Sequence, residues 1–145
     1  MSRAPLLGRA AYPAWERLDL RWDDADRYGH VNNAVHYRLM DSAVNRWLVA
    51  NDLLRLAGEG PIFLVAETAC RYAAPLDFPG SVDLGLAAER VGASSVSWRI
   101  GLFGAEQAAA AEGRFVHVLV DAATRRPVPM PDSWRERLQA VSLRP

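Results

Sequence analysis

The sequence predicts an α+β domain in which one long helix lies against an antiparallel β-sheet. The first observation is an apolar stripe that includes Tyr37, Met40 and Val44, at the three- and four-residue steps of an amphipathic helix. The second is a change of period after residue 61, where apolar residues alternate in four strand-like runs separated by short turns. Strands joined in this way pair as antiparallel neighbours, and one helix can cover one face of their sheet.

The composition is that of one globular domain. The 145 residues carry 17 basic and 17 acidic side chains, so the net charge of zero does not favour nucleic acid or an anionic membrane as a partner. No apolar run reaches the roughly 18 residues of a membrane span, and residues 1–9 lack the apolar region of a signal peptide. We therefore expect a cytoplasmic location.

The first predicted element is a strand, because Leu18, Leu20 and Trp22 alternate with charged residues and leave one face to solvent. Residues 1–14 hold prolines and few periodic positions. We expect them to form a loosely held lead-in to a single domain over residues 15–145.

The long helix is predicted to span about twenty residues. Asn32 or Asn33 is its expected N-cap, because an asparagine side chain can accept a hydrogen bond from a free amide of the first turn. Gly58, Gly60 and Pro61 are expected to end the helix and to start the next segment.

The strand after the helix is predicted to place the even-numbered residues from Ile62 to Tyr72 on one face and the odd-numbered residues on the other. Three more strands are predicted around residues 82–88, 96–102 and 107–121.

Two finer features are predicted near the end of the chain. Gly113 is the expected site of a β-bulge in the last strand. Ser133 and Glu136 have the spacing of a capping box, which would start a short terminal helix.

The loop between the first strand and the long helix carries the most specific motif, Asp26-Arg-Tyr-Gly-His-Val-Asn-Asn-Ala-Val-His-Tyr37. It resembles the loop of the hotdog-fold acyl-CoA thioesterases of the 4-hydroxybenzoyl-CoA thioesterase type. In that family an Asp, two residues and a Gly precede the helix. Long-chain acyl-CoA and plant acyl-carrier-protein thioesterases commonly continue with His-Val-Asn-Asn and then a Tyr, which here are residues 30–33 and Tyr37.

The resemblance implies a hotdog fold, a five-stranded antiparallel sheet wrapped around one long central helix, with a short C-terminal helix. It also implies that the amide of Asn33, seven residues after Asp26, donates to the oxyanion. Related branches carry His or Tyr at the position of Asn33, and plant enzymes carry Asn where Tyr28 stands. The family's catalytic sets therefore do not transfer as a whole.

The reaction that the resemblance implies, thioester hydrolysis, needs a nucleophile or activated water and a donor for the developing oxyanion, and the loop residues can supply both. Asp26 can act as a general base on water or attack the carbonyl directly. The free amides near Val31 to Ala34 lie at the positive end of a helix dipole and can bind the oxyanion. The alternative for Asp26 is an Asx-turn or a helix cap.

His30 is the third predicted catalytic residue. It can orient Asp26, carry a proton to the leaving thiolate, or hold the loop by hydrogen bonds. Tyr28 is a channel wall or, in the favoured reading, a packed loop aromatic. The residues expected to line the substrate site are Tyr28, Gly29, Val31, Asn32, Tyr37 and Glu67.

Other reactive side chains have plainer interpretations. Asp41, on the long helix, is a reserve catalytic acid whose alternative is an exposed carboxylate. Glu67 either enters the cleft of a neighbouring subunit or is a paired or rim carboxylate. Cys70 is expected to be a small buried hydrophobe, and His36 and His117 are expected to be satisfied packing residues.

No metal and no cofactor are expected, coenzyme A being part of the substrate. The histidines and acids lack helical ligand spacing, and no glycine-rich phosphate loop is present. Phosphates of coenzyme A would need surface arginines, for which the candidates are Arg90, Arg99, Arg125 and Arg126.

The sequence thus favours an Asp-dependent thioesterase that acts on acyl-CoA or on acyl carrier protein. The alternatives are a hotdog hydratase or dehydratase of enoyl or hydroxyacyl thioesters and a non-catalytic acyl-thioester-binding protein. A homodimer with its active site at the subunit seam, or a tetramer, is expected because one helix covers only one face of a sheet.

Overall fold

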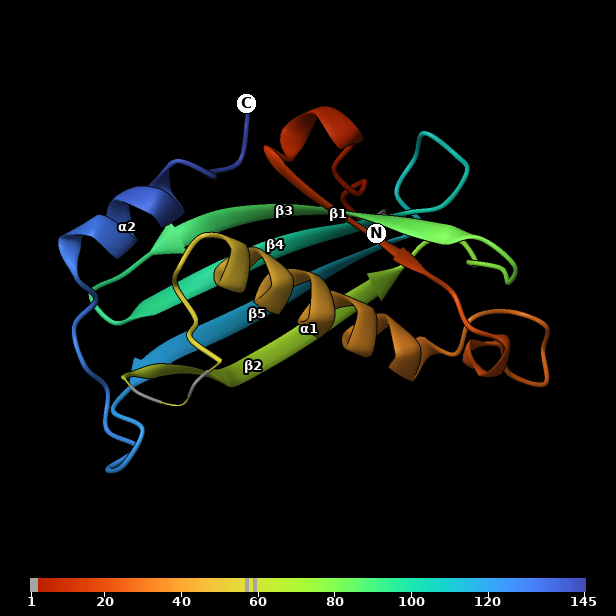
Figure 1. Ribbon diagram of the computed structural model, residues 1–145. Coiled ribbons are helices and arrows are strands. Elements are labelled where there is room, and N and C mark those ends of the chain that lie inside the picture. Colours follow the sequence, from red (N-terminus) through yellow and green to blue (C-terminus); the bar gives the residue numbers. More distant parts are fainter. Residues whose placement is uncertain (1–2, 57, 59) are drawn as a thin grey trace.

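A five-stranded antiparallel sheet with one long helix across it forms the body of the protein (Figure 1). The computed structural model describes residues 3–56, 58 and 60–145. The order of strands is β1-β3-β4-β5-β2, which confirms the predicted α+β class. No helix among the described residues is long and apolar enough to cross a membrane. The elements are β1 (Ala14–Asp19), α1 (Asn33–Ala50), β2 (Ile62–Tyr72), β3 (Ser81–Val91), β4 (Ser95–Phe103), β5 (Ala111–Val120) and α2 (Asp132–Gln139).

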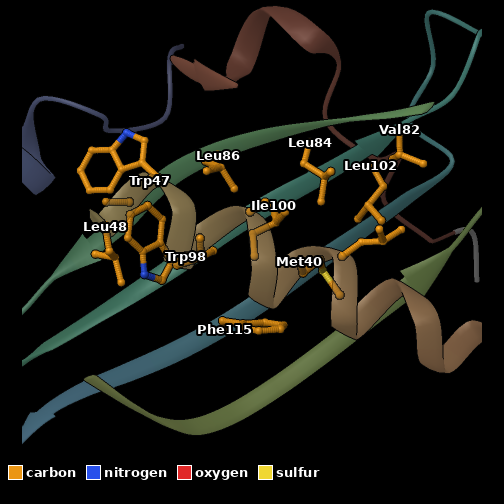
Figure 2. Close-up of a cluster of buried hydrophobic side chains, with 14 of the residues drawn as sticks. Met40, Trp47, Leu48, Val82, Leu84, Leu86, Trp98, Ile100, Leu102 and Phe115 are labelled. Atoms are coloured by element: carbon orange, nitrogen blue, oxygen red, sulfur yellow. The ribbon is translucent and has the colours of Figure 1, made fainter. Parts of the chain in front are cut away.

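The core lies between α1 and the sheet face that it covers (Figure 2). Met40, Trp47 and Leu48 of the helix point toward apolar side chains of β3, β4 and β5. The Trp47 ring meets the fully buried Trp98 ring edge-on, with the ring centroids 5.4 Å apart. Since each large apolar side chain contributes about 1.5–3 kcal/mol on full burial, this layer fixes where the helix lies.

The start of α1 is confirmed, since the Asn32 side chain accepts a hydrogen bond from the amide of Ala34 at 2.9 Å. Its end comes earlier than predicted. The helix stops at Ala50, before the glycines expected to end it, and the Asn51 amide donates to the Trp47 carbonyl. The Leu53 amide donates to the Leu48 carbonyl, and the Leu53 side chain is buried. These two contacts close the helix end.

The predicted faces of β2 are wrong beyond Val65, because a bulge shifts the register there. Val65 pairs with His117, whereas Glu67 pairs with the next residue of β5, Val116. Paired residues lie on the same face of a sheet, so Val65 and Glu67 lie on opposite faces. Glu67 therefore points away from α1.

The predicted bulge at Gly113 is also wrong. Gly113 pairs in register with Cys70 on one side and with Ile100 on the other. A Cβ atom at this position would clash with the sulfur of Met40. The glycine therefore lets α1 approach the sheet closely, which the sequence pattern cannot distinguish from a bulge.

The N-terminal segment is held firmly, contrary to the expected loose lead-in. Tyr12 is fully buried on the sheet face opposite α1, where its ring lies over Gly85 and Gly101. It also meets Phe103 edge-on, and Leu143 from the C-terminal segment packs against the same cluster. The face that α1 leaves open is thus partly covered by both ends of the chain.

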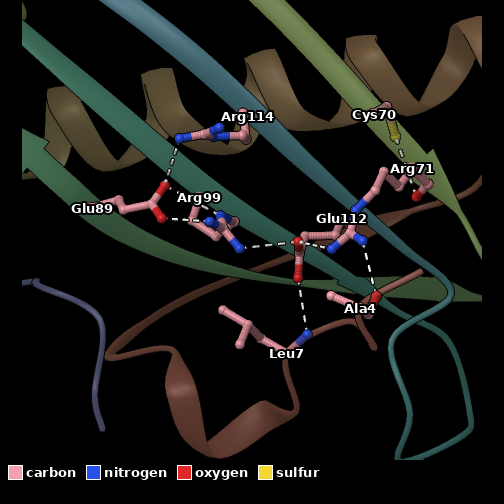
Figure 3. Close-up of polar contacts among 8 residues, drawn as sticks. All are labelled: Ala4, Leu7, Cys70, Arg71, Glu89, Arg99, Glu112 and Arg114. Carbon is pink, nitrogen blue, oxygen red and sulfur yellow. Dashed lines mark hydrogen bonds and ion pairs between the residues drawn. The ribbon is translucent and has the colours of Figure 1, made fainter. Parts of the chain in front are cut away.

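A buried carboxylate ties this segment to the sheet (Figure 3). Glu112 is 4% exposed and accepts hydrogen bonds from the Leu7 amide at 2.9 Å, from Arg71 at 2.8 Å and from Arg99 at 3.1 Å. Burial acts to raise the pKa of the Glu112 carboxyl, but the Leu7 amide and the two guanidinium groups outweigh it and hold the pKa below 4.5. Arg71 also donates to the Ala4 carbonyl.

Two terminal details differ from the sequence reading. β1 ends at Asp19, and Trp22 lies in a 3-10 turn with 84% of its surface exposed rather than on a strand face. The capping box is wrong as well. α2 begins at Asp132 with Pro131 as its N-cap residue, and no side chain caps it.

Replacing Gly85 by alanine is expected to lower the free energy of unfolding by about 1–3 kcal/mol. The added Cβ would lie 2.5 Å from Cγ of Tyr12, whose ring is enclosed. Urea unfolding followed by tryptophan fluorescence measures the change. Gly8→Ala is the matched control, since a Cβ there meets no atom within 4 Å and φ is −80°. Equal stabilities of the two variants would contradict this packing.

Glu112→Gln is expected to lower stability near neutral pH by about 3–5 kcal/mol, because it leaves two guanidinium groups without their buried partner. The folded-state pKa of Glu112 is depressed, so its contribution is present above the unfolded pKa and is lost as the pH falls through the folded pKa. The difference between wild type and variant should therefore shrink below pH 4.5. Glu106→Gln, at an exposed loop acid, should show no such pH-dependent difference.

Candidate active site

The motif loop is a tight turn that begins at Asp26. The Asp26 carbonyl accepts from the Gly29 amide at 3.1 Å, and the Asp26 amide donates to the His30 carbonyl at 2.9 Å. Gly29 has φ +83°, a conformation that residues with a Cβ rarely adopt. The glycine is therefore required by the turn itself.

The loop is fastened to the β2–β3 connection and to its own base. The Val31 amide donates to the Leu76 carbonyl at 2.8 Å, and Val31 pairs with Ala25 in an isolated bridge. The Asn32 amide donates to the Asp24 carbonyl at 2.9 Å. Both ends of the loop are thus fixed where α1 begins.

Asp24 is a buried anchor rather than a catalytic acid. Its carboxylate accepts from the Arg21 amide at 2.7 Å and from the Arg38 guanidinium on α1 at 2.6 Å. The Arg21 guanidinium also lies 3.8 Å from this carboxylate. Because Arg38 follows one turn after the helix start, this ion pair holds the loop against the helix.

A pocket of about 400 Å³ opens where the loop, the start of α1 and the end of β2 meet. Three of the predicted site residues line it together, Asp26, Val31 and Asn33. The other residues that line it are His36, Tyr72, Ala73, Ala74 and Pro75.

The two residues expected to supply thioester chemistry, Asp26 and Asn33, both line this pocket. One oxygen of the half-buried Asp26 carboxylate accepts from the Tyr28 amide at 2.8 Å, which is an Asx-turn. Within the described residues, the other oxygen has no hydrogen-bond donor. Asn33 is the first residue of α1, so helix geometry gives its amide no acceptor in the helix. A carboxylate oxygen and a helix-start donor therefore remain for a ligand.

His30 and Tyr28 lie outside the pocket. The His30 ring is half exposed and bonds to Asp77 at 2.7 Å. In the part of the chain that the structure describes, no hydrogen bond joins His30 to the Asp26 carboxylate. Tyr28 is 87% exposed, so the expected packing of this aromatic ring is wrong.

The remaining predicted residues are spread around the helix and the sheet. Tyr37 stacks on Phe115 with the ring centroids 6.4 Å apart, and Asn32 caps α1. Glu67 is exposed on the face opposite α1. Asp41 is exposed on α1 and accepts from Asn45.

His36 and Tyr72 are pocket residues that the sequence reading did not select. The Nδ1 atom of His36 lies 3.1 Å from the Asn32 carbonyl oxygen, and its ring meets the Tyr72 ring edge-on at 4.9 Å. The Tyr72 hydroxyl donates to the Asn33 carbonyl at 3.1 Å. His36 could have been found from its spacing, because residues three apart on a helix share a face and Asn33 precedes it by three.

Other ionisable groups near the core are not equipped for catalysis. Burial raises the pKa of the Cys70 thiol, which disfavours a thiolate nucleophile. His117 is 2% exposed between Phe63 and Phe115, and neither of its nitrogens has a partner among the described residues, so the expected satisfied histidine is wrong. Burial lowers the pKa of His117 to about 4. Arg99 is committed to Glu89 and Glu112 and is not free to bind a phosphate.

A larger groove of about 980 Å³ lies on the other side of Ala74 and Pro75, which line both spaces. Its charged side chains are Arg9, Arg17, Asp77, Asp83 and Glu106. The two arginines both pair with Asp83, so the groove offers no excess of positive charge to an anionic ligand. Among the described residues, no group of three or more His, Cys, Asp or Glu side chains could hold a metal ion.

Comparisons with known proteins place the chain in a family. Residues 20–138 match the sequence pattern of the Thioesterase-like superfamily. The PA5185 protein of Pseudomonas aeruginosa strain PAO1 is 39% identical, with a TM-score of 0.89 over 94% of this chain and 96% of that one. A thioesterase of Thermus thermophilus, solved with coenzyme A and Zn, is 31% identical, with a TM-score of 0.76 over 90% and 94% of the two chains.

A 1,4-dihydroxy-2-naphthoyl-CoA thioesterase of Synechocystis shares the fold at 16% identity, with a TM-score of 0.76 over 86% of this chain and 94% of that one. No curated protein matches the chain. The family match spans the loop, the helix and all strands after β1. It agrees with the resemblance drawn from the Asp26–Tyr37 motif. The chain therefore belongs to the Thioesterase-like superfamily and is a hotdog-fold thioester hydrolase.

Proposed function

We propose that the protein hydrolyses acyl-CoA to the free acid and coenzyme A. The coenzyme A is part of the substrate, and the reaction needs no other cofactor. The observation that carries the proposal is the shared pocket, which is lined by Asp26, with one carboxylate oxygen outside the Asx-turn, and by Asn33, the first residue of α1. The 31% identical relative solved with coenzyme A supports this carrier over acyl carrier protein.

The two groups have complementary roles. The thioester oxygen accepts a hydrogen bond from the Asn33 amide, where the helix dipole favours the charge that develops as the carbonyl carbon becomes tetrahedral. Asp26 either attacks that carbon directly or removes a proton from the water that does. The carbon–sulfur bond then breaks, and coenzyme A leaves as the thiol after it takes up a proton.

Loop geometry supports Asp26, among the acids of this segment, for this task. Asp24 is buried against Arg38, and Asp23 lies exposed in the 3-10 turn, so neither lines the pocket. The Asx-turn holds one Asp26 oxygen in place and thereby aims the other. An Asx-turn and a catalytic role are therefore compatible for Asp26, because the turn uses one carboxylate oxygen and leaves the other for the reaction.

We also propose that the working form is a homodimer joined along β2. This strand has 11 residues, ends the sheet, and pairs only with β5 among the described residues. Its middle residues are exposed, and of its large side chains Val65 is 46% and Tyr72 42% exposed. A long edge with free backbone groups pairs readily with another strand. Tyr72 lines the pocket, so a partner on this edge would stand beside the site.

Asp26→Asn is expected to lower kcat for acyl-CoA hydrolysis by about 10²–10⁴-fold. The asparagine oxygen can still accept from the Tyr28 amide, so the turn is kept while the charge is lost. Thiol release over acyl-CoAs of several chain lengths and over aryl-CoAs measures the effect. Asp23→Asn, an identical change at an exposed acid of the same segment, should retain wild-type rates.

If Asp26→Asn cleaves these substrates as fast as wild type, the assignment of the site is wrong. A separate incubation of the wild-type enzyme with enoyl-CoA tests the hydratase alternative, because hydration of the double bond removes the enoyl chromophore. Loss of the chromophore without thiol release would support a hydratase in place of the hydrolase.

A double variant, Val65→Lys with Thr68→Lys, is expected to be monomeric and to lose most activity, because charged side chains on an edge strand oppose its pairing. Sedimentation velocity measures the mass, and thiol release the activity. Asp19→Lys places the same charge on the other edge strand, β1, as the control. A double variant that stays dimeric would exclude the β2 edge as the interface.

A further inference from the structure

His36 lines the pocket but has no role in the reaction as proposed above. It lies on the first turn of α1, three residues after Asn33, and lines the same space as Asp26. Only 3% of its surface is exposed. Its ring contacts the Asn32 carbonyl and packs nearly perpendicular to the Tyr72 ring, and these two contacts orient it.

The hydrogen bond at Nδ1 determines the tautomer. A carbonyl oxygen can only accept, so the Nδ1 atom that lies 3.1 Å from the Asn32 carbonyl carries the hydrogen. The other nitrogen, Nε2, is then the acceptor of the neutral ring. Within the described residues Nε2 has no hydrogen-bond partner, and it is not one of the fully enclosed orphan atoms, unlike both nitrogens of His117.

The charge state suits a base. Burial lowers the pKa of His36 below 6.5, although the carbonyl groups of Asn32 and Asn33 act against this change. The ring is therefore neutral near neutral pH. A neutral, oriented imidazole with one free nitrogen in a reaction pocket is a group that can receive a proton.

We propose that His36 is a catalytic base whose Nε2 removes a proton from the attacking water. This inference rests on the proposed thioester hydrolysis and assigns the roles within it. His36 and Asp26 cannot both receive the same proton, so the carboxylate becomes the nucleophile.

In the first step a carboxylate oxygen of Asp26 bonds to the carbonyl carbon, and the carbon–sulfur bond breaks. This leaves an acyl–Asp26 anhydride and a thiolate. In the second step water bonds to the acyl carbon as its proton passes to Nε2, and the bond between that carbon and Asp26 breaks. The imidazolium then returns its proton to the thiolate, which leaves the free acid, the thiol, neutral His36 and ionised Asp26.

His30 cannot fill this role in the same way. Its Nδ1 is bonded to Asp77, and its ring does not line the pocket. Tyr72 cannot either, because burial raises the pKa of its hydroxyl well above its ordinary value. Of the titratable groups that line the pocket, His36 is thus the one that is neutral and has a free acceptor nitrogen.

The test is a rapid-mixing measurement of thiol release by His36→Gln with excess acyl-CoA. Glutamine is a neutral polar residue of similar length, but its amide nitrogen is not basic and cannot receive the proton. Because the first step does not need His36, we expect a burst of about one thiol per site and then turnover about 10²–10⁴-fold slower than wild type. Hydroxylamine added after the burst should trap the acyl group as a hydroxamate.

Controls separate this proposal from the proposed function. Asp26→Asn should show no burst and only the slow turnover expected above, and full turnover by that variant would overturn the hydrolysis mechanism itself. His117→Phe removes the other buried imidazole, away from the pocket, and should release thiol as wild type does.

Two outcomes would overturn the role of His36 alone. One is wild-type turnover by His36→Gln, and the other is slow turnover without a burst or a trapped acyl group. If the glutamine variant does not fold, judged by circular dichroism, His36→Asn is measured in its place with the same expectations.

Discussion

The packing of α1 across the face of β3, β4 and β5 is the interaction on which the rest of the structure depends. Its buried residues, from Leu39 to Leu48, meet side chains such as Trp98 and Ile100 in one continuous cluster. Gly113 allows this contact because a side chain there would clash with Met40. Since the helix is fixed along its length, its first turn is fixed as well, and the pocket is built on that turn.

The position of the first turn gives the loop its chemistry. Asn32 caps the helix, Asp24 and Arg38 tie the loop to it, and the half-buried Asp26 lines the same pocket as Asn33, the first residue of α1. The turn at Gly29 is supported by the β2–β3 connection through Leu76. Local hydrogen bonds therefore hold a charged group at a helix start, where the dipole favours a developing oxyanion.

Much of the fold was open to prediction because its signals are local and periodic. The helical stripe and the alternating strands gave the class and the order of elements, and the motif gave three of the pocket residues, Asp26, Val31 and Asn33. The register of β2 was not open to prediction, since the bulge after Val65 depends on its pairing with β5. Nor was the burial of Tyr12, which depends on glycines of strands far away in the chain.

The sequence by itself determined the α+β class, the order of the elements and the loop in which a carboxylate precedes a helix start, because period, capping and turn residues act over a few neighbours. Tertiary structure decided which other side chains share the pocket with the motif residues. In the folded chain His30 bonds to Asp77, and Glu67 lies on the sheet face opposite α1. His36 and Tyr72 line the same pocket as Asp26. These outcomes depend on how β2 and the β2–β3 connection meet the helix start, and contacts between distant segments leave no periodic trace in the chain.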